Sequence, residues 1–164
     1  MKSPDGLLVR RLAMPPAART SGRIAILLST FDGEPFLDEQ LRSFLTQTHP
    51  NWVLHWRDDG SADQTVAIME AFARGPAAGR CVAVPGEEQR LGAKASFLGL
   101  LAAALDAEPD ADAFAFADQD DVWLPDKLAR GLAALAAVPA AVPALYCARQ
   151  VLVEVERRGL VERR

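Results

Sequence analysis

Apolar and polar residues follow two alternating periods along the chain from residue 23 onward. A short apolar run within 23–29 predicts a strand that is covered on both faces, as in a parallel sheet. Apolar residues then recur at helical spacing from Leu37 to Leu45, and Pro35 and Pro50 bound this predicted helix. The first unit is therefore a strand followed by a helix.

The same unit repeats further along the chain. Strands are predicted at 52–57, 81–84 and 113–117, and helices at 62–74, 93–106 and from Pro125 to about Pro139. Ser61 and Gln64 have the spacing of a capping box at the start of the second helix. Residues 145–147 read as the start of one more strand. Alternating strands and helices predict an α/β, Rossmann-like fold, a mostly parallel sheet with helices on both faces.

Length and charge narrow the class of protein. A chain of 164 residues suits one domain, which we place at 23–150, between a loosely ordered tail at 1–22 and a charged tail at 151–164 without clear period. An apolar fraction of 50% and a net charge of −4 exclude a disordered chain. A pI near 5.2 argues against a protein that binds nucleic acid through its phosphate groups.

Cysteines and apolar runs indicate the cytoplasm. Cys81 and Cys147 are the two cysteines and form no CxxC pattern, so neither a disulfide framework nor a zinc site is predicted. The longest apolar candidate, residues 97–105, ends at Asp106 and is too short to span a bilayer. Charged residues interrupt the N-terminal stretch where a signal peptide would need an apolar run.

Acidic residues cluster after the predicted strands. Because parallel strands end along one edge, these carboxylates are expected to share it. They are Asp32, Asp58, Asp59, Asp118, Asp120 and Asp121. Oxygen ligands without His or Cys favour a hard cation, Mg²⁺ or Mn²⁺, which leaves an open side for phosphate oxygens. A nucleotide diphosphate held through the metal is therefore predicted, although any single Asp also suits a turn or a helix cap.

Other motifs are absent or point to structure. The sequence contains neither G-x-G-x-x-G nor the phosphate-loop pattern, and Gly33 and Gly60 read as turn residues. Trp123 is expected to fill the core. His49 and His55 have no neighbour in sequence that would form a catalytic triad or a metal site with them.

Four ordered segments resemble the family 2 glycosyltransferases of GT-A fold, and most closely a bacterial rhamnosyltransferase-like subgroup. The segments are 24–41, 47–52, 57–65 and 117–128. The resemblance spans about residues 23–150. It implies an inverting, metal-dependent transfer of a sugar from a nucleotide-diphosphate donor to a polysaccharide or lipid-linked acceptor. For that subgroup the acceptor lies at the inner face of the cytoplasmic membrane, which implies peripheral membrane association.

The resemblance also implies roles for particular residues. Ser29, Thr30 and Phe31 would lie against the donor nucleotide, with Asp32 adding a charge nearby. Asp59 would hydrogen-bond the base, and Lys94 would lie near the donor. The divalent ion that bridges the diphosphate would be held by Asp118, Asp120 and Asp121. Such an ion stabilises the charge that develops on the leaving group.

The sequence departs from the family pattern in two respects. Relatives continue well beyond the position of Arg164, and their later part supplies the catalytic base and much of the acceptor site, so we expect a donor-binding half. No base is assigned among Glu154, Glu156 and Glu162. In addition, Phe31-Asp32 replaces the more usual Tyr-Asn, and Ser96 stands where the subgroup often has Asn.

Two alternatives to an active transferase stay open at this point. One is a catalytically silent nucleotide-binding fragment. The other is a haloacid-dehalogenase-type phosphatase, because residues 114–122 place a D-x-D-x-V pattern after an apolar strand. That family needs this motif near the start of its domain, followed by a Lys and an acidic pair, and here little chain follows it.

Overall fold

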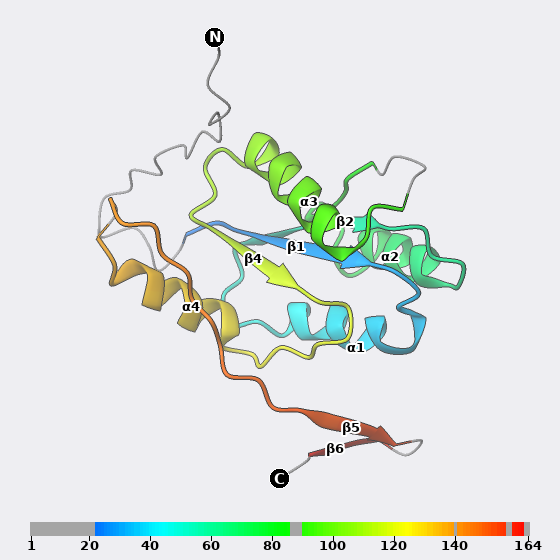
Figure 1. The fold of residues 1–164 in the computed structure, drawn as a ribbon. Helices are drawn as coiled ribbons and strands as arrows, with labels where there is room; N and C mark the ends of the chain where they lie inside the picture. Colours follow the sequence, from blue (N-terminus) through cyan, green and yellow to red (C-terminus); the bar gives the residue numbers. More distant parts are fainter. Residues whose placement is uncertain (1–21, 86–89, 140, 157–158, 163–164) are drawn as a thin grey trace.

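The computed structural model describes residues 22–85, 90–139, 141–156 and 159–162. Strands and helices alternate along it, followed by a pair of strands (Figure 1). The elements are β1 (Ile24–Thr30), α1 (Glu34–Leu45), β2 (Trp52–Asp58), α2 (Thr65–Arg74), β3 (Cys81–Ala83), α3 (Ala93–Ala107), β4 (Ala113–Ala117), α4 (Lys127–Ala136), β5 (Val153–Glu156) and β6 (Gly159–Glu162).

The main sheet is parallel, with strand order β3-β2-β1-β4. Ile24 lies opposite both Trp52 and Ala113, so β1, β2 and β4 start at one level and their carboxyl ends share one edge. The chain steps outward from β1 to β2 and β3, then returns through α3 to β4 on the far side of β1. The predicted α/β, Rossmann-like fold is confirmed.

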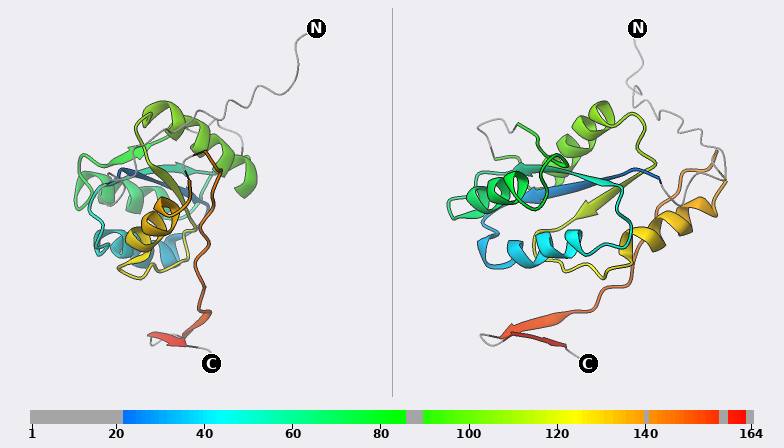
Figure 2. Two further views of the ribbon diagram at one scale, coloured as in Figure 1. Left: turned by 90° about the vertical axis from the view of Figure 1, so that its left-hand side faces the viewer. Right: turned by 180° about the vertical axis from the view of Figure 1, so that it is seen from behind.

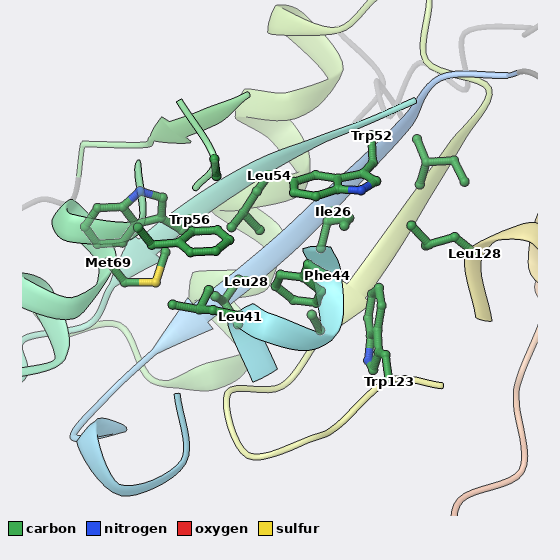
Figure 3. Packing of buried hydrophobic residues seen from close by; sticks show 14 of the residues in the cluster. Ile26, Leu28, Leu41, Phe44, Trp52, Leu54, Trp56, Met69, Trp123 and Leu128 are labelled. Carbon is green, nitrogen blue, oxygen red and sulfur yellow. The ribbon is translucent and has the colours of Figure 1, made fainter. Parts of the chain in front are cut away.

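One face of the sheet carries the main hydrophobic core. Side chains of β1 and β2 pack there against α1, α2 and α4 (Figure 3). Phe44 of α1 is fully buried, with its ring centroid 4.9 Å from that of Trp123 and 6.3 Å from that of Trp52. The prediction that Trp123 belongs to the core is confirmed. Because Trp123 lies two residues after Asp121, the core anchors the segment 118–121.

Helix α3 covers the opposite face, where Leu27 packs against Leu100 and Ala104. Figures 1 and 2 show α3 and α1 on opposite sides of the sheet, as predicted. His55 is buried on this face, with Nε2 3.3 Å from Glu108, which also pairs with Arg23. This imidazole therefore has a structural partner at the end of the sheet remote from the strand exits.

The start of α2 differs from its prediction. The helix begins at Thr65, three residues after the predicted 62, and the Ser61–Gln64 capping box does not form. Ser61 Oγ donates instead to Asp58. Asp63 accepts from the Thr65 amide at 2.9 Å and, through its other oxygen, from the Glu34 amide at 3.0 Å. One carboxylate thus serves the starts of both α1 and α2, which local spacing alone does not reveal.

The C-terminal part of the chain also differs. The predicted strand at 145–147 is wrong, because these residues form no ladder and Tyr146 instead packs beside Gly131 of α4. Residues 153–162, where no period was recognised, contain the antiparallel pair β5 and β6, a sheet separate from the first (Figure 2). Of the predicted N-terminal tail, residues 1–21 lie outside the described residues. Gly22 is buried, and its carbonyl lies 2.8 Å from His49 Nε2.

Candidate functional site

A cleft of about 210 Å³ opens at the carboxyl-terminal edge of the sheet. It lies where the strand order reverses, between the exits of β1 and β4, which is where open α/β sheets bind ligands. The lining residues are Ser29, Thr30, Phe31, Asp59, Arg90, Gly92, Ala93, Phe97, Asp118 and Gln119. The exits of β1, β2 and β4 therefore contribute to one cavity, together with the start of α3.

The exits of β1 and β4 are tied together by a side-chain amide. Gln119 Oε1 accepts from the Phe31 amide at 2.8 Å, and Gln119 Nε2 donates to the Phe31 carbonyl at 2.8 Å. The ring of Phe31 lies under the guanidinium of Arg90, whose central carbon is 3.6 Å from the ring centroid. Phe31 thus links two walls of the cleft.

Asp59 joins β2 to the start of α3. Its carboxylate pairs with Arg57 at 2.7 Å and accepts from the amides of Leu91 and Gly92 at 2.8 and 2.7 Å. Burial alone would raise the pKa of Asp59, but Arg57 and the two amides outweigh it and hold that pKa below its usual range. Asp59 therefore stays ionised and fixes the loop that carries Arg90.

A buried hydroxyl pair completes this wall. Ser29 Oγ donates to Ser96 Oγ at 2.7 Å, and the Arg57 guanidinium donates to Ser96 at 2.9 Å. Ser96 stands where the resembled subgroup often has Asn, and it connects β1, β2 and α3 beneath the cleft. The floor of the cleft is thus a polar network in which the buried guanidinium of Arg57 has hydrogen-bond partners.

Of the six carboxylates expected on one edge, Asp59 and Asp118 line the cleft, and Asp32, Asp58, Asp120 and Asp121 do not. Asp58 accepts from Thr30 Oγ1 and from the amides of Gly60 and Ser61, so it shapes its own turn. Asp32 is exposed, with φ 45°, and accepts from the Ala62 amide at 2.8 Å. Neither lines the cleft, because the backbone amides of the turn after β2 take up both carboxylates.

The acidic segment after β4 is suited to a cation. Partial desolvation and the nearby charges of Asp120 and Asp121 raise the pKa of Asp118. Asp121 lies near Lys127, whereas Asp118 and Asp120 form no ion pair with any described residue. Among the described residues no three acidic, His or Cys side chains are grouped to hold a metal. In proteins Mg²⁺ is commonly bound by one or two carboxylates together with substrate phosphates. The carboxylates of this segment therefore fit a hard cation whose remaining ligands come from a bound phosphate group.

Comparison with known proteins identifies the family. A family model described as Glycosyl transferase family 2 matches residues 25–161. The chain belongs to glycosyl transferase family 2. The resemblance found in the sequence is thereby confirmed, and the haloacid-dehalogenase alternative loses its support.

Individual relatives agree with this family assignment. The dTDP-rhamnosyl transferase RfbG of Shigella flexneri is 32% identical over 101 residues, which are 62% of this chain and 34% of RfbG. A mannosyltransferase from Pyrobaculum calidifontis, solved in complex with GDP-Man and Mn²⁺, has a TM-score of 0.59 at 23% identity over 73% of this chain and 33% of its own. S. aureus TarS 1–349 has a TM-score of 0.53 at 22% identity, covering 68% and 31%. The chain spans about a third of the length of these proteins.

Within the family 2 fold, the structure gathers most of the predicted site residues and adds others. Ser29, Thr30, Phe31, Asp59 and Asp118 line the cleft, whereas Lys94 is exposed on the first turn of α3, next to the lining residue Ala93. No role was predicted for Arg57, Arg90 or Gln119. Arg57 begins the segment 57–65 and Gln119 lies inside the acidic segment, so their positions in the sequence were the available signal, whereas Arg90 lies in none of the four segments.

A second, larger cavity of about 660 Å³ lies between β4, α4, residues 138–139 and residues 141–148. This cavity is lined mainly by apolar residues, and its charged lining residues are Asp112 and Lys127. These lining residues form no group suited to catalysis or to metal binding. Along the part of the chain that the structure describes, no helix combines the length and apolar character needed to cross a bilayer.

Proposed function

We propose that this chain forms the donor-binding part of a glycosyltransferase that uses a nucleotide-diphospho-sugar. The observation that carries the proposal is the cleft at the reversal of strand order, which is lined by Phe31, Asp59 and Asp118. Asp118 forms no ion pair with any described residue. Membership of family 2 supports the same chemistry. Solved proteins of similar fold, with UDP, UDP-GlcNAc or GDP-Man bound, support a nucleotide-sugar donor.

In this proposal the donor nucleotide lies against the exit of β1. Ser29, Thr30 and the ring of Phe31 form its wall, and Arg90 presents a planar cation to the same space. Asp59 holds the Arg90 loop and contacts the base. Asp32 and Lys94 each adjoin a lining residue in the chain, and they contact parts of the donor that extend beyond the cleft.

We further propose that the acidic segment of Asp118, Asp120 and Asp121 holds Mg²⁺ or Mn²⁺ against the donor diphosphate, with one or two of these carboxylates in direct contact with the ion. When bound, such a cation supplies charge stabilisation for the diphosphate leaving group. The carboxylates orient it, and the apolar ring of Phe97 limits water on the α3 side of the cleft. Mn²⁺ in the complex of the Pyrobaculum calidifontis mannosyltransferase supports this choice.

The reaction we propose is an inverting transfer, which needs a base, usually a carboxylate, to take the proton of the acceptor hydroxyl. We assign no described residue to that role. The proposed acceptor is a surface polysaccharide or a lipid-linked glycan, used at the cytoplasmic face of the membrane. The dTDP-rhamnosyl transferase relative supports the donor class, a nucleotide-diphospho-sugar.

Calorimetry with UDP and with dTDP, each with and without Mn²⁺, tests the proposal. We expect binding that strengthens with Mn²⁺. Metal-independent binding or no binding contradicts the donor site. Transfer from a radiolabelled nucleotide sugar then separates an active transferase from a silent nucleotide-binding fragment, since the fragment binds the nucleotide without turnover.

A further inference from the structure

We propose that Gln119 is a positioning residue for the acidic segment: its amide fixes residues 118–121 to the exit of β1 and so sets where Asp118 and Asp120 meet a diphosphate-bound cation. This inference rests on the proposed function, because it concerns the same cleft. Gln119 lies between the acidic residues Asp118 and Asp120. It carries no charge, and it is not a metal ligand in the proposal.

The first observation is the paired hydrogen bond. Gln119 Oε1 and Nε2 satisfy the amide and the carbonyl of Phe31, both at 2.8 Å. The ladder between β1 and β4 ends at Leu28 and Ala117, so beyond that point a side chain replaces the backbone pairing. Two simultaneous bonds fix the plane of an amide, whereas a single bond would let it rotate.

The second observation is the close approach of Gly33. A Cβ at Gly33 would overlap the Gln119 side-chain oxygen, so the absence of a side chain there admits the amide. The backbone of Gly33 is itself held, because its amide donates to Thr65 Oγ1 at 2.8 Å. The wall that receives Gln119 is therefore rigid from two directions.

The third observation is that the contact of Gln119 with Phe31 restrains a segment with several negative charges. Gln119 lies between Asp118 and Asp120, which form no ion pair with described residues and lie close enough to affect one another. Mutual repulsion would spread these carboxylates if the segment were free. Two neutral bonds to β1 hold the segment in place without neutralising it, which leaves its charges available to a cation.

The chain supplies a matched control in Gln47. Its amide also bridges backbone groups, donating to the Leu124 carbonyl at 2.9 Å and accepting from the Leu128 amide at 3.1 Å. Gln47 does not line the cleft. Gln119→Ala and Gln47→Ala therefore remove similar structural contacts, but only the first contact lies at the proposed cation site.

The experiment measures UDP affinity by calorimetry, with and without Mn²⁺, and the urea midpoint of unfolding. We expect both variants to unfold at lower urea. We expect Gln119→Ala to weaken Mn²⁺-dependent UDP binding by about 10- to 100-fold, the usual cost of losing a group that orients a metal ligand. Metal-free UDP binding should change much less, and Gln47→Ala should match the wild type in both affinities.

A double-mutant cycle tests the same contact from its other side. Gly33→Ala should weaken Mn²⁺-dependent binding in the wild type, because the new methyl displaces the amide. In the Gln119→Ala background the methyl meets no amide, so the same change should add little. Unchanged Mn²⁺ dependence in Gln119→Ala, or an equal loss in Gln47→Ala, overturns the positioning role alone. Absence of Mn²⁺-dependent UDP binding by the wild type overturns the proposed function and this inference together.

Discussion

Arg57 and Asp59 form an ion pair with an N–O distance of 2.7 Å in which each side chain is only 4% exposed. The pair lies beneath the cleft and is completed by Ser96 and by the amides of Leu91 and Gly92. A buried charge is tolerated when its hydrogen-bonding capacity is used, as it is here. The pair therefore joins β2 to the start of α3 and determines the shape of one wall of the site.

Removing one partner of this pair should be costly. We predict that Asp59→Ala lowers the free energy of unfolding by about 3 kcal/mol or more, because it leaves the Arg57 charge buried without its counterion. Urea unfolding measures the change. The control is Glu70→Ala, which breaks an exposed i,i+4 pair with Arg74 and should cost no more than ~0.5 kcal/mol. Equal costs for the two variants would show that the pair is not buried as described.

Stability should fall with acid partly through Glu108. The Arg23 guanidinium lowers the pKa of Glu108, and this effect exceeds the opposing effect of burial. The pKa of Glu108 is lower in the folded state than in the unfolded state, where it is about 4.3. Its carboxylate therefore stabilises the fold fully at pH values above the unfolded pKa. This contribution is lost as the pH falls through the folded pKa. We predict that the urea midpoints of wild type and Glu108→Gln differ most near neutral pH and converge below about pH 4. A difference that is constant with pH would contradict the assignment.

Removing one charge from the acidic segment should reduce metal-dependent binding. We predict that Asp120→Asn weakens Mn²⁺-dependent nucleotide binding by at least ~1–2 kcal/mol, the scale of one charged contact. Asp126→Asn is the control, because it makes the same chemical change in a surface pair with Arg130, at the start of α4. Calorimetry with UDP and Mn²⁺ compares the two. Unchanged affinity in Asp120→Asn would remove that residue from the site.

The fold could be predicted from the sequence because its strands are apolar runs, of which β1 and β2 are buried on both faces. Strong apolar runs located β1 and β4 within a residue, and helical periodicity located α1 and α3. The start of α2 was missed because Asp63 caps it while also serving α1, a contact between segments far apart in the chain. Strand β5 has the alternating Val-Glu-Val-Glu pattern of a strand, and the charge of the tail concealed it.

The candidate site was predicted less completely, for a physical reason. Strand ends indicate which residues reach an edge, so Asp59 and Asp118 were found, and the family resemblance added Phe31. The same rule cannot show whether a carboxylate faces the cleft or its own turn. Asp58 faces its own turn, where it accepts hydrogen bonds from the amides of Gly60 and Ser61. Nor does it reveal Gln119, whose contact with Phe31 joins residues 88 positions apart.

The central claim is that the strand exits form one metal-dependent site for a nucleotide diphosphate. Paramagnetic broadening of backbone amide signals by Mn²⁺, recorded with and without UDP, tests its location directly. The account predicts that UDP confines the broadening to amides at the carboxyl ends of the strands, including Phe31, Gly92 and Gln119, and spares Ile24 and Ala113 at the opposite end of the sheet. Broadening centred on Ile24 and Ala113, or broadening that UDP does not change, would contradict it.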